Sequence, residues 1–129
     1  MMNEVIIMFV GNYADMPKID MTPGGAKGTV KQVVIGPEQG WEDYVLRVMT
    51  VEPNGYSPTH AHDWPHINYV ISGNGVVMIS GKEYPVEKGT CAYVPSNEEH
   101  CFINRGMCRW NLSALYRSVE RHNVGNEKE

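Results

Sequence analysis

The grouping of apolar residues along the chain constrains the fold most. These residues stand in short runs rich in β-branched and aromatic side chains, and turn residues such as Gly36-Pro37 close the runs. Nowhere does an apolar stripe at helical spacing persist for a dozen residues. Without helices to connect parallel strands, this pattern predicts an all-β antiparallel sandwich or barrel.

The turn residues also place the individual strands. Gly81-Lys82 indicates a hairpin between two of them, and residues 14–29 are expected to be irregular chain. Residues 5–10 are expected to form a strand or an arm. The remaining expected strands are 30–35, 44–51, 67–72, 76–80, 83–86, 90–94, 100–104 and 109–116.

Length and composition favour one domain spanning residues 1–129. A chain of 129 residues with 42% apolar residues can bury a core of its own. Within it we expect an N-terminal arm over 1–27, a barrel core over about 28–116, and a polar tail over 117–129. The formal charge of −4 argues against a nucleic-acid surface.

No targeting or membrane signal is expected either. The longest apolar run, residues 5–10, is too short to cross a bilayer and lacks the basic start of a signal peptide. Cytoplasmic location is therefore the default. Cys91, Cys101 and Cys108 are odd in number and form no Cys-x-x-Cys pattern, so we expect buried free thiols.

The histidines point to a metal site. His60, His62 and His66 fall within seven residues, and His100 lies downstream beside another expected strand. Neutral imidazole is the commonest protein metal ligand. Four imidazoles gathered inside a small barrel without a metal would leave ring nitrogens unpaired, at a cost in free energy. His122 lies in the polar tail and is expected to be ordinary surface.

These stretches resemble the two signature motifs of the cupin family. The first motif is a glycine, His-x-His, a further ligand and a second glycine, and the matching residues are Gly55, His60, His62, His66 and Gly73. The matching residues of the second motif are Gly89, Pro95, His100 and Asn104. The resemblance covers about residues 28–116 and implies the double-stranded β-helix, or jelly-roll, barrel of cupins.

Three departures from the family pattern matter. Only four residues separate Gly55 from His60, and Asn97 replaces the usual glycine of the second motif. His66 stands where cupins usually have glutamate. This last change resembles small single-domain cupins with a four-histidine site, several of which hold manganese, and such cupins often pair through an N-terminal strand. The resemblance thus implies a homodimer.

A four-histidine site sets the expected metal chemistry. Four neutral imidazoles leave one divalent ion per chain with its full charge, which favours anionic ligands. Octahedral geometry leaves two open positions, whereas tetrahedral zinc bound by four histidines would have none. Manganese or iron is therefore expected as the working metal, although nickel, copper or zinc can also occupy such a site.

The expected partner is a small anionic or enolisable molecule. Resemblance to four-histidine cupins implies oxygenase chemistry first, with isomerase, lyase or cyclase chemistry next. A non-catalytic sensing or ligand-binding module is the alternative, and a purely structural metal is a third. No general base stands out in the sequence, and neither nucleic acid nor membrane is expected as a partner.

Four further residues are expected near the metal. Strand alternation puts Arg47 on one face with Met49, where Arg47 could hold a substrate carboxylate. The alternatives for Arg47 are a salt bridge to Glu42 or Asp43, or a dimer contact. Asn68 could reach the site or serve the core, while Phe102 shares parity with His100 and is expected to form an apolar wall.

Overall fold

The computed structural model describes residues 8–117. The strand expected over residues 5–10 lies partly outside this range, and residues 8–10 form no strand. The expected polar tail and His122 also lie outside the described residues.

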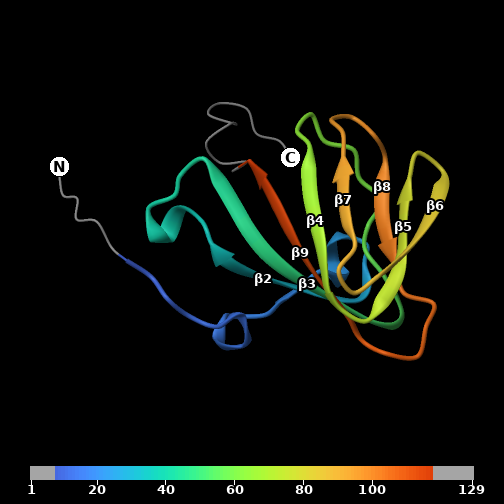
Figure 1. Cartoon of the computed structure of the whole chain (residues 1–129), viewed down its shortest axis with the longest axis horizontal. Helices are drawn as coiled ribbons and strands as arrows, with labels where there is room; N and C mark the ends of the chain where they lie inside the picture. Colours follow the sequence, from blue (N-terminus) through green and yellow to red (C-terminus); the bar gives the residue numbers. More distant parts are fainter. Residues whose placement is uncertain (1–7, 118–129) are drawn as a thin grey trace.

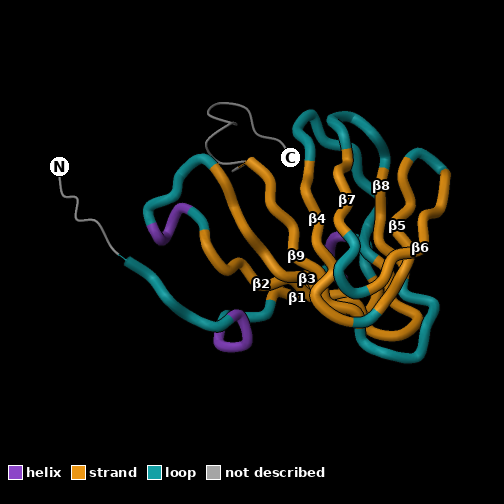
Figure 2. Tube along the Cα trace, viewed as in Figure 1, coloured by secondary structure: helices purple, strands orange, loops and turns teal. Residues whose placement is uncertain are grey.

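The described chain forms one strongly curled antiparallel sheet (Figures 1 and 2). The strands are β1 (Ile19–Asp20), β2 (Lys27–Ile35), β3 (Tyr44–Tyr56), β4 (His66–Ser72), β5 (Asn74–Ile79), β6 (Lys82–Glu87), β7 (Cys91–Val94), β8 (His100–Ile103) and β9 (Trp110–Arg117). Three short 3-10 helices connect parts of the described chain: η1 (Tyr13–Asp15), η2 (Thr22–Gly24) and η3 (Pro37–Gln39). The main path of the sheet runs β6-β5-β8-β3-β9-β4-β7, and β2 pairs with β3 and carries β1 beside it. The all-β prediction is confirmed.

Strand β3 holds the sheet together because it pairs with β2, β8 and β9. It continues to Tyr56, so the expected end of this strand at residue 51 is wrong. Asn54 adopts a left-handed backbone (φ 68°), and its N–H donates to the carbonyl oxygen of Asn104 at 2.8 Å. At Gly55 an added Cβ would lie 2.6 Å from the Lys27 carbonyl oxygen. Glycine lets β2 approach here, so the strand bends without ending.

The core lies inside the curl. Its buried apolar cluster is Met49, Val51, Val70, Val77, Val86, Phe102, Trp110 and Leu112. Asn104 is fully buried and donates to the carbonyl oxygens of Val51 (2.8 Å) and Cys108 (2.9 Å), which ties β3 to the loop before β9. No helix in the described chain is long and apolar enough to span a bilayer.

The prediction of buried cysteines is right for one residue and wrong for two. Cys101 is buried, whereas Cys91 and Cys108 are exposed. Cys91 begins the edge strand β7 and Cys108 lies in the loop before β9. Cys91 shares the outward face of β7 with the exposed Tyr93, and a loop leaves Cys108 in water, so apolar character alone did not decide their burial.

Candidate metal centre

The sheet brings the histidines together from two places in the chain. His66 begins β4 and His100 begins β8. His62 lies in the loop between β3 and β4. The backbone of His60 pairs with that of His100 through two N–H to carbonyl hydrogen bonds of 3.0 and 2.8 Å. These bonds align the two sequence motifs side by side.

Three of the four expected ligands converge. The ring nitrogens that His62, His66 and His100 can offer lie within 4.8 Å of one another. The ring centroids of His66 and His100 are 4.5 Å apart, and those of His62 and His66 are 5.2 Å apart. His66 and His100 are buried, and His62 is half-buried.

His60 lies at the rim of this cluster. Its ring centroid is 5.2 Å from that of His62, and it lines the same cavity, but it is exposed and outside the convergent group of three. The described structure therefore brings together three histidines that could hold a metal ion, with a fourth next to them.

The buried polar atoms fit a metal ion. Both ring nitrogens of His66 are buried without a hydrogen-bond partner in the described chain, an arrangement that costs free energy unless something binds them. His100 Nδ1 lies 3.0 Å from the Glu98 carbonyl oxygen. Because a carbonyl only accepts, Nδ1 carries the proton and Nε2 is left with its lone pair, as in many metal-binding histidines.

The imidazoles of this cluster stay neutral at physiological pH. Burial, followed by the nearby His100, lowers the pKa of His66 to about 3 and that of His62 to about 4. Burial also lowers the pKa of His100, while its bond to Glu98 acts in the opposite direction. Neutral imidazole is the form that binds metals, so the site is prepared for a cation without prior loss of protons.

Two contacts hold the His62 loop in place. The Trp64 ring stacks on His62 with centroids 4.6 Å apart and planes 9° apart. The Asn97 N–H donates to the His62 carbonyl oxygen at 2.5 Å, from a left-handed backbone with φ 66°. Asn97 thus takes the conformation that the usual glycine of the second motif would adopt.

Arg47 lies at the same site. It lines the small histidine cavity together with Met49, and its guanidinium carbon lies 5.1 Å from the centre of the Tyr116 ring. Its Nε atom is buried without a hydrogen-bond partner in the described chain. The Tyr116 ring centroid is in turn 5.8 Å from that of His66.

A model of the cupin domain matches residues 47–115, more than half of the chain. The chain belongs to the cupin family. No curated protein matches it, so the more specific comparisons come from solved structures.

Many solved structures share the fold of this cupin. A polyketide cyclase from Streptomyces resistomycificus is 26% identical with a TM-score of 0.80, over 86% of this chain and 80% of that one. A "predicted oxalate decarboxylase" from Thermotoga maritima is 21% identical with a TM-score of 0.74, over 86% of this chain and 100% of the other. An RmlC-like cupin from Shewanella frigidimarina is 15% identical with a TM-score of 0.71, over 92% and 97% of the two chains.

The other expected pocket residues of this cupin divide into two groups. Met49 and Phe102 line the histidine cavity, which has a volume of about 20 Å³. The Ser57 hydroxyl accepts the Phe102 N–H at 2.8 Å and so fixes this wall. Asn68 is buried but does not line the cavity, and its side-chain N–H donates to the Ser113 carbonyl oxygen at 3.3 Å.

Sequence reasoning missed Tyr116 as a residue of the site. One signal was available, because Tyr116 shares the parity of Trp110, Leu112 and Ala114, which are all fully buried. Its contact with Arg47 depends on the register that pairs β9 with β3, where Val45 faces Tyr116 and Arg47 faces Ala114. The composition of two strands about 70 residues apart in sequence does not predict the register in which they pair.

Proposed function

We propose that this cupin is a metal-dependent enzyme acting on a small anionic or enolisable substrate. The observation that carries the proposal is the convergence of His62 and His100 on His66, whose two ring nitrogens are buried and unpartnered in the described chain. We assign His60 as the fourth ligand, since it lines the same cavity and its ring centroid is 5.2 Å from that of His62.

The metal is one divalent ion per chain. Imidazole donors suit iron, zinc, copper and nickel, and manganese follows from the four-histidine resemblance. Zinc would keep an open position, as catalytic zinc sites do, only if His60 stayed at the rim and three histidines bound the ion. A bound divalent ion would supply Lewis-acid polarisation of a substrate oxygen.

The protein residues around the site would bind and orient the substrate. Arg47 presents a guanidinium whose buried Nε has no partner in the described chain, and we assign it the substrate carboxylate. Tyr116 supports the guanidinium from one face. Met49 and Phe102 form apolar walls that exclude water from the reacting atoms.

The cavity lining offers no carboxylate base, because none of the described residues that line it is Asp or Glu. A similar structure at 26% identity is a polyketide cyclase, which supports cyclisation, isomerisation or lyase chemistry. Oxygenase chemistry is the second candidate, favoured by the four-histidine resemblance.

Two measurements on the metal-loaded protein test the proposal. Oxygen uptake and mass-spectrometric product analysis are followed with a panel of 1,3-dicarbonyl compounds, phenols and small acids. Turnover without oxygen uptake supports the cyclase-like function, and turnover with uptake supports an oxygenase. Tight binding without turnover across the panel would contradict an enzyme and favour a ligand-binding module.

A further inference from the structure

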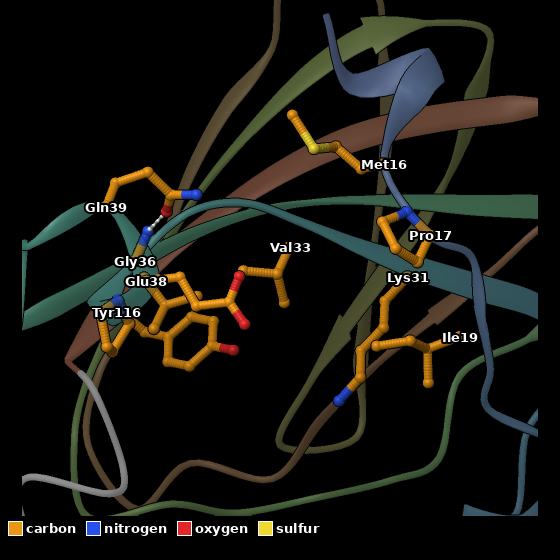
Figure 3. A pocket seen from close by; sticks show the side chains of 11 residues that line it. Met16, Pro17, Ile19, Lys31, Val33, Gly36, Glu38, Gln39 and Tyr116 are labelled. Atoms are coloured by element: carbon orange, nitrogen blue, oxygen red, sulfur yellow. Dashed lines mark hydrogen bonds between the residues drawn. The ribbon is translucent and has the colours of Figure 1, made fainter. Parts of the chain in front are cut away.

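Figure 3 shows a second and larger cavity. It lies beside the histidine site, because its lining residue Tyr116 has a ring centroid 5.8 Å from that of His66. Its volume is about 530 Å³, within the usual range for small-molecule sites. We call it the outer chamber. Its lining comes from β2 (Lys31 and Val33), β3 (Val45) and β9 (Tyr116) on one side, and from residues 16–19 and η3 on the other.

Side-chain hydrogen bonds fix the walls of the outer chamber. The amide of Gln32, which is 2% exposed, donates to the carbonyl oxygens of Tyr13 at 2.8 Å and Met16 at 3.1 Å. These bonds attach the N-terminal segment to β2. On the opposite wall, the Gln39 side-chain oxygen accepts the Gly36 N–H at 2.7 Å and holds η3 (Figure 3).

The Arg47–Tyr116 pair lies between the outer chamber and the histidine cavity. Along β3, Val45 lines the outer chamber, whereas Arg47 lines the histidine cavity. Tyr116 lines the outer chamber on one side, and its ring is 5.8 Å from the His66 ring on the other. A molecule that contacts Tyr116 in the outer chamber is therefore separated from the His66 ring by the thickness of the Tyr116 ring.

The two cavities differ in the size of the group that each can hold. About 20 Å³ beside the histidines is room for roughly one water-sized group, so only the reacting atoms of a ligand fit there. The remaining atoms of a larger ligand need space outside this cavity, and the outer chamber, whose walls are mostly apolar, lies next to it across the Arg47–Tyr116 pair.

Lys31 gives the outer chamber a cationic group. It is half-buried, its side chain extends into the chamber across from Tyr116 (Figure 3), and it makes no ion pair within the described chain. Burial and the nearby charge of Arg47 lower its pKa. Glu38, which is exposed, also lines the chamber. An anion placed between Lys31 and Arg47 would relieve the repulsion of these two cations.

We propose that the outer chamber binds the ring-containing apolar body of an organic acid, whose anionic group lies between Lys31 and Arg47 while another oxygen reaches the histidine site. The inference rests on the proposed function and extends it, because it makes the substrate larger than a simple dicarboxylate. Lys31 and Val33 would then determine which acids this cupin accepts.

The experiment compares a two-ring acid with a small one. Isothermal titration calorimetry measures binding of 3-hydroxy-2-naphthoate and of oxalate to the zinc-loaded full chain. Lys31→Met should weaken naphthoate binding about 10- to 100-fold, as expected for loss of a charged partner, and leave oxalate binding unchanged. Val33→Phe, which fills the chamber, should weaken naphthoate in the same selective way. Lys88→Met, at an exposed turn, is the matched control.

The outcomes separate this inference from the proposed function. Unchanged naphthoate affinity in both Lys31→Met and Val33→Phe, with thermal unfolding intact, overturns the inference even if metal is bound. Absence of metal by elemental analysis contradicts the proposed function instead. In that case, selective weakening of naphthoate binding by Lys31→Met in the metal-free chain still supports ligand binding in the outer chamber. The inference is also overturned if naphthoate does not bind and the protein is a dimer in size-exclusion chromatography that Val33→Phe dissociates. That result would mean that a second copy of the chain covers the outer chamber.

Discussion

The guanidinium carbon of Arg47 lies 5.1 Å from the centre of the Tyr116 ring, a cation–π contact between β3 and β9 on the inner face of the sheet. The neighbours of Arg47 on that face of β3, Val45 and Met49, are buried. The aromatic ring thus offsets part of the cost of a cation at the site, while the buried Nε atom remains without a partner in the described chain.

Removing this charge should weaken binding of small acids. Arg47→Met keeps the bulk of the side chain, and we expect it to reduce the affinity of the metal-loaded protein for oxalate or citrate by about 2 kcal/mol, since a charged hydrogen-bond partner is lost. Calorimetric titration checks this. Arg105→Met, which removes an exposed partner of Glu83, should have no effect. Unchanged affinity in Arg47→Met with metal retained would assign Arg47 to structure.

Replacing His66 with glutamate tests the ligand that departs from the usual cupin pattern. His66→Glu should keep the metal, because a carboxylate is also a metal ligand. It should weaken anion binding, because it makes the site one unit less positive. Metal content and oxalate affinity are measured on the same preparation. Complete loss of metal would show that the position demands the reach of an imidazole.

The pH dependence of the metal-free protein follows from the lowered pKa values. His62 and His66 have folded-state pKa values of about 4 and about 3, below the ordinary value of 6.5. The unfolded chain therefore takes up protons first as the pH falls, so the free energy of unfolding should decrease from about pH 6.5 towards pH 4. Urea unfolding at a series of pH values measures this.

A matched variant identifies the source of that pH dependence. His66→Phe cannot take up a proton, so its unfolding free energy should fall less steeply over the same range. Bound metal should oppose the acid loss, until protons compete for the imidazoles. An unfolding free energy for the metal-free protein that is flat or rises between pH 6.5 and pH 4 would contradict the burial of neutral histidines.

The close approach of Gly75 to Trp110 predicts a stability effect away from the site. A Cβ added at Gly75 would lie 2.2 Å from the indole ring of Trp110, which is fully buried. Gly75→Ala should therefore destabilise the fold by about 1–3 kcal/mol, as overpacking does. Gly24→Ala, where an added Cβ meets nothing within 4 Å, is the control in thermal unfolding. Equal midpoints for the two variants would contradict the packing.

Local patterns predicted most of the sheet and the identity of the clustered histidines. Alternation alone placed Arg47 with Met49 on the inner face, and the structure brings both to the histidine cavity. The end of β3 was mispredicted because Pro53-Asn54-Gly55 has the composition of a turn, whereas long-range pairing with Asn104 keeps the strand going.

The outer chamber could not be predicted from the sequence. Its N-terminal wall is placed by Gln32, whose side chain bonds to carbonyl groups 16 and 19 residues earlier in the chain. Such contacts between a strand and an irregular segment far away in sequence carry no periodic signal. For the same reason, the position of His60 at the rim, outside the convergent three, depends on loop geometry that motif spacing does not encode.

Elemental analysis of metal content tests the central claim most directly. We expect one divalent ion per chain in the native protein, severe loss of metal in His62→Ala, and no loss in His122→Ala, a residue outside both motifs and outside the described part of the chain. A native protein that holds no stoichiometric metal after loading, or equal metal content in the two variants, would contradict a metal centre built on these histidines.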